Sequence, residues 1–137
     1  MNSKYELSQA IAIFRTLKIN DAFYGNISNA ELSFLVVIYN LGKKAVASML
    51  KVYFNCSKVY VSKIVKKLVD GGYLEVNVGS RDRRLNELTI TDKGIEVVKK
   101  NMNIYMEKTN YLFDKLGEEK AVKLTELLKE ANAILKK

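Results

Sequence analysis

The stretch SKVYVSKIVKKLVDGGYL, residues 57–74, combines an apolar stripe with a basic surface. Apolar residues recur in it at the three- and four-residue spacing of a helix that buries one side. The residues of this stripe are Val61, Ile64, Val65 and Leu68. Ser57 can cap the start of the helix, and Gly71 and Gly72 can end it. The stretch therefore predicts a helix to about Asp70 that packs on a core and turns its lysines to solvent.

The period of the apolar residues changes after this helix. Leu74, Val76 and Val78 alternate with polar residues, which is typical of a half-buried strand, and Leu88 and Ile90 repeat the pattern. The connection between the two runs is longer than a two-residue turn, so we expect a β-hairpin with an exposed tip. Three arginines fall in that tip: Arg81, Arg83 and Arg84.

Three helices are expected before residue 57. The first covers about residues 4–23, where apolar residues recur at helical spacing. The second starts at a capping box formed by Ser28 and Glu31 and ends at Gly42. The third is short, about residues 46–54, and we expect its inward side chains to be Met49, Leu50 and Tyr53. A short helix, a turn and a basic amphipathic helix in succession predict a helix-turn-helix unit.

Two further helices are expected after the hairpin. Thr91 can cap the first of them, which should reach Leu116, where Gly117 breaks it. The second carries apolar residues over about 121–135. The order of the elements predicts a mainly α fold with a small β-hairpin, in which a winged helix-turn-helix lies between terminal helices. The length favours a single domain over residues 1–137.

The positive charge of the chain is concentrated in its middle third. The 137 residues include 23 lysines and arginines and 15 aspartates and glutamates, a net charge of +8. Residues 43–84 hold ten basic and three acidic side chains, so nearly all the excess lies in the predicted helix-turn-helix and hairpin. A basic block between balanced segments indicates a surface for a polyanion, with nucleic acid the leading candidate. The alternative is a solvated lysine face without a partner.

The composition argues against several other classes of protein. The chain has no histidine, which removes the common nucleophile–histidine pairs and histidine-containing zinc sites. Glu118 and Glu119 are adjacent, but neighbouring helix positions do not face each other. We therefore expect no enzyme, no cofactor and no metal site. The single cysteine, Cys56, fits the reducing cytoplasm and is interpreted as a buried small side chain instead of a redox switch. No apolar run approaches the roughly 18 residues of a membrane helix.

The predicted hairpin tip and the helix start after it resemble the MarR family of winged-helix transcription regulators. In SRDRRLNELTITDKG, residues 80–94, Asp82 and Arg84 match the Asp-x-Arg of the family's wing. Ile90, Thr91 and Gly94 occupy the positions of its Leu-Thr-x-x-Gly, with isoleucine in place of the usual leucine.

The basic helix is similar to the recognition helix of the same family. Leu68 and Gly72 match its Leu-x-x-x-Gly ending. In the order and size of the elements the resemblance covers the whole chain, and at the level of motifs it covers about residues 57–94. The third predicted helix departs from the family pattern, because Lys51 and Tyr53 replace its more usual residues.

The resemblance implies a homodimeric regulator, most simply a repressor, that binds a pseudo-palindromic site in double-stranded DNA. About residues 30–94 would bind DNA, and about residues 4–24 and 95–136 would form the dimer. Release by a small-molecule effector is also implied as an option, without its identity. The residues implied to meet DNA are Ser57, Lys58, Val59, Tyr60, Ser62, Lys63, Lys66, Lys67, Arg81 and Arg83. Asp82 and Arg84 would shape the wing.

Two functions from other classes stay open beside this one. The basic face could bind an acidic protein, or it could hold the chain at an anionic membrane surface. The membrane is disfavoured, because the basic residues lie on a compact helix-hairpin unit and not beside an exposed apolar stripe. We assign several aromatic residues to core and dimer packing in preference to an effector pocket: Phe14, Phe23, Tyr24, Tyr39, Tyr105 and Phe113.

Overall fold

The structure of the protein, a computed structural model, describes residues 2–78 and 86–135. The elements in order are α1 (Ser3–Thr16), α2 (Asn29–Leu41), the 3-10 turn η1 (Gly42–Lys44), α3 (Ala47–Phe54), α4 (Lys58–Asp70), β1 (Leu74–Val78), β2 (Asn86–Ile90), α5 (Asp92–Leu116) and α6 (Glu118–Leu135). The predicted mainly α fold with one small hairpin is confirmed.

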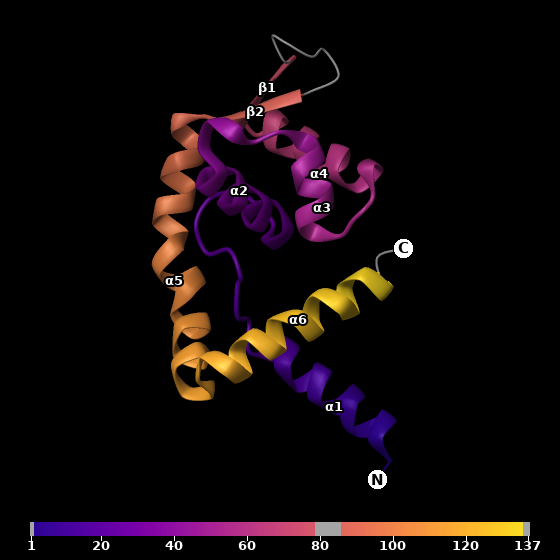
Figure 1. Ribbon diagram of the computed structural model, residues 1–137. Helices are drawn as coiled ribbons and strands as arrows, with labels where there is room; N and C mark the ends of the chain where they lie inside the picture. Colours follow the sequence, from indigo (N-terminus) through magenta and orange to yellow (C-terminus); the bar gives the residue numbers. More distant parts are fainter. Residues whose placement is uncertain (1, 79–85, 136–137) are drawn as a thin grey trace.

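The middle of the chain gathers in one lobe around a hydrophobic core. α2, α3, α4 and the hairpin lie together beside the first half of α5 (Figure 1). The four residues predicted as the apolar stripe of α4 are all buried. Each enclosed leucine or phenylalanine stabilises the fold by about 1.5–3 kcal/mol. The most enclosed apolar side chains are Leu32, Phe34, Leu35, Ile38, Leu50, Leu68, Leu74 and Val98.

The hairpin is antiparallel, and it is attached to the lobe at its base. Leu74 pairs with Ile90, and Val76 pairs with Leu88. Leu74 and Leu88 are buried as the alternation predicts, whereas Val76 is 40% exposed. The backbone N–H of Leu88 also donates a hydrogen bond to the carbonyl of Ala45 at 2.9 Å. The hairpin is therefore attached to the segment that precedes α3.

Thr91 and Gly94 join the hairpin to the end of α4. The hydroxyl of Thr91 accepts a hydrogen bond from the N–H of Gly94 at 3.1 Å, which confirms the predicted cap, and donates one to the carbonyl of Gly72 at 2.7 Å. A Cβ on Gly94 would lie 2.3 Å from the carbonyl oxygen of Tyr73. The Thr-x-x-Gly spacing thus caps α5 and lets its first turn pass against the backbone that leads into β1.

The inward row of α3 differs from the prediction. Leu50 is buried, but Met49 is 38% exposed and Tyr53 is 60% exposed. Phe54, four residues after Leu50, occupies the inner side instead, and its ring stacks on Phe34 with the ring centroids 4.3 Å apart. The aromatic partner on α2 therefore decides the register of this short helix.

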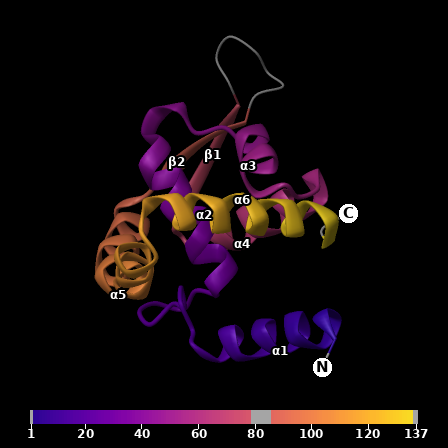
Figure 2. The ribbon, with the colours of Figure 1, turned by 60° about the horizontal axis from the view of Figure 1, so that its bottom comes forward.

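α1 and α6 lie at the end of α5 that is farther from the hairpin, and both helices run to the same side of the molecule (Figures 1 and 2). α1 has no buried residue, and the buried residue of α6 is Ala121. The helix predicted over residues 4–23 ends at Thr16, and Lys18 has the left-handed backbone angle φ of 49°. The prediction was wrong over the last seven residues of that range.

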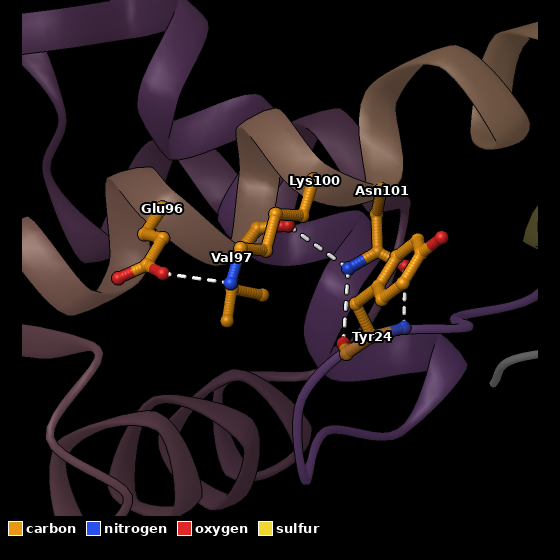
Figure 3. A network of polar contacts seen from close by, with 5 residues as sticks. All are labelled: Tyr24, Glu96, Val97, Lys100 and Asn101. Atoms are coloured by element: carbon orange, nitrogen blue, oxygen red, sulfur yellow. Dashed lines mark hydrogen bonds and ion pairs between the residues drawn. The ribbon is translucent and has the colours of Figure 1, made fainter.

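The chain between α1 and α2 is held by hydrogen bonds to α5. The amide of Asn20 donates to the carbonyl of Tyr105 at 2.8 Å. The oxygen Oδ1 of Asn101 accepts from the backbone N–H of Phe23 at 2.8 Å. It also accepts from the backbone N–H of Tyr24 at 3.0 Å (Figure 3). The backbone N–H groups of Phe23 and Tyr24 bond to α5 and are not available for a continued helix.

Candidate nucleic-acid interface

α4 presents its basic face because its two ends and its apolar side are held by the lobe. The hydroxyl of Ser57 accepts a hydrogen bond from the N–H of Tyr60 at 3.1 Å, and this confirms the predicted N-cap. At the other end, Gly72 has a φ of +80°, which stops the helix before β1. The side chains opposite the buried stripe point to solvent and are exposed: Lys58, Val59, Ser62, Lys63, Lys66 and Lys67.

The outermost row of α4 runs through Val59, Lys63 and Lys66, which are spaced four and three residues apart. Lys66 forms an ion pair with Asp70 at 3.0 Å, and both side chains are well exposed. Such a surface pair contributes little free energy. Asp70 reduces the net charge only at the C-terminal end of the row, so the first half of α4 carries the stronger positive field.

A pocket of about 290 Å³ lies between α3, α4 and β2. Lys51 and Lys58 bring positive charge to it, and Ser48, Ser62 and Asn86 bring groups that can donate hydrogen bonds. Sequence reasoning missed Ser48, Lys51 and Asn86 as interface residues. Lys51 could have been included, because it lies within the basic block of the sequence. Ser48 and Asn86 could not, because they come together only when the hairpin lies beside α3.

The side chain of Tyr60 lies partly at the surface and partly against the core. Its ring is half-buried and meets the ring of Phe34 edge-on, with the centroids 5.9 Å apart. Packing against α2 therefore holds this tyrosine in place. A contact of Tyr60 with DNA stays a prediction. The predicted wing residues Arg81, Asp82, Arg83 and Arg84 lie outside the described residues, and their roles also stay predictions.

Cys56 lies in the turn between α3 and α4 and belongs to the core cluster, with 8% of its surface exposed. This agrees with its interpretation as a small buried side chain. Across residues 2–78 and 86–135, no three acidic or cysteine side chains gather in a way that could hold a metal ion. None of the helices in the same ranges is long and apolar enough to cross a membrane.

The far end of the molecule has a different surface, which is apolar. A pocket of about 630 Å³ lies between the end of α1 and the second half of α5, and Phe14, Leu17 and Tyr111 are among its lining residues. Phe14 and Phe113 also border a smaller pocket where α1, α5 and α6 meet. The large apolar side chains exposed on α1 and α6 are Tyr5, Leu7, Ile11, Ile13, Phe14, Val122, Leu127, Leu128, Ile134 and Leu135.

The six aromatic residues that were assigned to packing do not all pack in this chain. Tyr39 and Tyr105 are partly buried against the core, as expected. Phe23 and Tyr24 are 58% and 47% exposed on the connection before α2. Phe14 and Phe113 lie at the apolar far end, where they can pack fully only against a partner that covers this surface.

The arrangement of these elements is that of several solved transcription regulators. No protein-family model matches the chain. A MepR-like protein, crystallised with pseudoligands, superimposes with a TM-score of 0.79 at 17% identity, over 98% of this chain and 96% of that one. A mutant of MarR from E. coli, in complex with operator DNA, superimposes with a TM-score of 0.71 at 18% identity, over 95% and 96% of the two chains. The chain has the MarR winged-helix fold.

In this MarR-type fold, α3 and α4 form the helix-turn-helix and β1 and β2 are the strands of the wing. The resemblance first seen in the residues around the wing is thus confirmed for the fold. Among characterised proteins, the HTH-type transcriptional regulator BilQ of Clostridium symbiosum (strain WAL-14163) is 29% identical over 115 residues, which covers 78% of this chain and 80% of BilQ.

Proposed function

We propose that the chain is a MarR-family transcription regulator that binds specific sites in double-stranded DNA as a homodimer and acts as a repressor. The observation that carries the proposal is the exposed basic face of α4. This helix is the second of the helix-turn-helix, and the core holds its opposite side. The similarity to BilQ and the operator DNA bound to the E. coli MarR mutant support it. The role is one of binding, without catalysis, in the cytoplasm.

In the proposed complex, the start of α4 enters the major groove and α3 crosses the DNA backbone. Lys58, Lys63 and Lys67 contact phosphates, which sets the affinity, while side chains near the start of α4 read base edges. Arg83, with Arg81 beside it, enters the adjacent minor groove, whose negative potential attracts arginine. Asp82 and Arg84 shape the wing.

The apolar far end supports the dimer. α1 and α6 expose many large apolar side chains and bury almost nothing within one chain, and patches of this kind mark protein interfaces. A second copy of the chain would cover both helices. The two α4 helices would then reach successive major grooves about one helical turn apart on a pseudo-palindromic operator.

Binding to random duplex DNA at several salt concentrations tests the DNA-binding step. We expect the logarithm of the association constant to fall linearly with the logarithm of salt concentration, because lysines displace counterions from phosphates. Arg83→Ala should weaken binding to a selected operator by roughly 1–3 kcal/mol, and Lys99→Ala, at an exposed position of α5, should not. No binding to any duplex at low salt would contradict the proposal and favour an acidic protein partner.

Sedimentation of a charge variant tests the dimer. Leu127 is 55% exposed on α6, and Leu127→Glu would place a charge in the proposed interface. We expect this variant to sediment as a monomer at concentrations where the parent protein is a dimer. Lys129→Glu, an exposed position on the same helix, is the matched control and should remain dimeric. A monomeric parent protein would refute the dimer but not DNA binding by the single lobe.

A further inference from the structure

We propose that Val59 recognises the 5-methyl group of a thymine, so that each half of the operator carries an A·T pair opposite the start of α4. The inference rests on the proposed function and goes beyond it by naming a base. Val59 is 79% exposed, which is the largest exposed fraction among the large apolar side chains described in the winged-helix part.

Neither packing within the chain nor helix formation explains why a valine stands at position 59. The residue lies on the side of α4 opposite the buried stripe and is not part of the core cluster. A β-branched residue also favours a helix less than alanine, lysine or glutamate does. A valine in the first turn of an exposed, basic helix therefore costs stability slightly and gains nothing within the chain.

The surroundings of Val59 indicate DNA as the partner that the side chain meets. Val59 begins the outermost row of α4, with Lys63 and Lys66 after it and Lys58 beside it. In a helix-turn-helix the first residues of the second helix contact base edges. The lysines further along the row are placed for phosphates, so the apolar side chain is the one that comes nearest to the bases.

The chemistry of the major groove selects thymine. Among the base edges exposed there, thymine carries a methyl group beside its O4 acceptor, whereas guanine, adenine and cytosine present donors or acceptors of hydrogen bonds and no methyl group. Valine cannot pair with those groups, and covering them leaves them without water or a partner, which costs free energy. Contact with the thymine methyl buries apolar surface on both sides. Tyr60 packs its ring against Phe34, so the neighbouring large side chain is directed partly to the core.

Removal of one methyl group from the operator tests this inference. The operator is first selected from a random duplex pool with the full-length protein, and each thymine is then replaced singly by deoxyuridine, which lacks only the methyl group. Binding is measured by fluorescence anisotropy. We expect one thymine in each half-site where the replacement weakens binding roughly three- to tenfold, as loss of a buried methyl group predicts.

Two variants assign that methyl group to its partner. Val59→Ala should bind the thymine and deoxyuridine operators with nearly equal affinity. Val52→Ala is the matched control, because Val52 on α3 is 75% exposed and lies outside α4, and it should discriminate as the parent protein does. Both changes are at exposed positions, and circular dichroism checks that the helices are intact.

The outcomes separate the inference from the function on which it rests. If the protein selects an operator but no deoxyuridine replacement weakens binding, or if Val59→Ala keeps the full discrimination, the role of Val59 is wrong and the regulator stands. If no duplex is bound at low salt, both fall together. Loss of discrimination in Val59→Ala, with discrimination kept in Val52→Ala, supports the inference.

Discussion

The side-chain amide of Asn101 forms hydrogen bonds with both backbone polar groups of Tyr24, a residue 77 positions away. Its Nδ2 donates to the carbonyl of Tyr24 at 3.0 Å and to that of Val97 at 2.9 Å, and its Oδ1 accepts from the N–H of Tyr24 at 3.0 Å and from that of Phe23. Asn101 is 1% exposed. One side chain of α5 thus fixes the path of the chain from α1 to α2.

Asn101→Leu should lower the free energy of unfolding by about 1–3 kcal/mol, because leucine fills a similar volume but leaves backbone groups of Phe23 and Tyr24 without partners. Urea denaturation at a fixed protein concentration measures the change. Asn103→Leu is the control, since Asn103 is exposed on the same helix. Equal stability of the two variants would contradict the structural role of Asn101.

Gly94→Ala should destabilise the protein, although alanine favours a helix over glycine by about 1 kcal/mol. The added Cβ would lie 2.3 Å from the carbonyl oxygen of Tyr73 and 2.7 Å from Cγ1 of Ile90. Relief of such overlap requires α5 to shift from the base of the wing, at a cost of about 1–3 kcal/mol. The midpoint of thermal unfolding reports the sign, and a rise in that midpoint would show that α5 is not packed this closely.

Lys63→Ala should weaken binding to all duplexes to a similar degree, because a lysine on a phosphate carries no sequence information. We expect the slope of log affinity against log salt to decrease by about 1 for each protomer. Lys99→Ala, at an exposed position of α5 away from the proposed interface, should leave the slope unchanged. A change of sequence preference without a change of slope would instead assign Lys63 to a base.

The ion pair between Glu96 and Lys100 predicts a small dependence of stability on pH. Lys100 donates to Glu96 at 2.8 Å, and this hydrogen bond, followed by the attraction between the charges, lowers the pKa of Glu96 and raises the pKa of Lys100 from their usual values (Figure 3). The stabilising contribution is therefore present above the usual pKa of a glutamate and below the usual pKa of a lysine. It is lost as pH falls through the lowered pKa of Glu96 or rises through the raised pKa of Lys100.

Glu96→Gln should lower the midpoint of thermal unfolding slightly at neutral pH, and the difference from the parent protein should vanish in acid. The effect is small because both side chains are exposed, and salt should reduce it further. Glu107→Gln, at another exposed position of α5, is the control. A difference that persists unchanged after Glu96 is protonated would mean that the amide disturbs packing and not charge.

α4 illustrates what could be predicted without a structure. Its cap at Ser57, its apolar stripe and its glycine stop are local signals that agree with one another, and consistent local signals are reliable. The candidate interface followed from the same residues, because the side chains opposite a buried stripe are exposed. The end of α1, the register of α3 and the inward packing of Tyr60 were not predictable in this way, since each depends on a partner elsewhere in the chain.

The sequence by itself determined the kinds of elements and their order, because caps, breakers and apolar periods act over a few residues. Only the tertiary structure decided where α1 ends and which side of α3 is buried. The end of α1 depends on bonds from Asn20 and Phe23 to α5, across 85 and 78 residues, and the register of α3 depends on the stacking of Phe54 on Phe34. A pattern read along the chain carries no information about such distant partners until the fold brings them together.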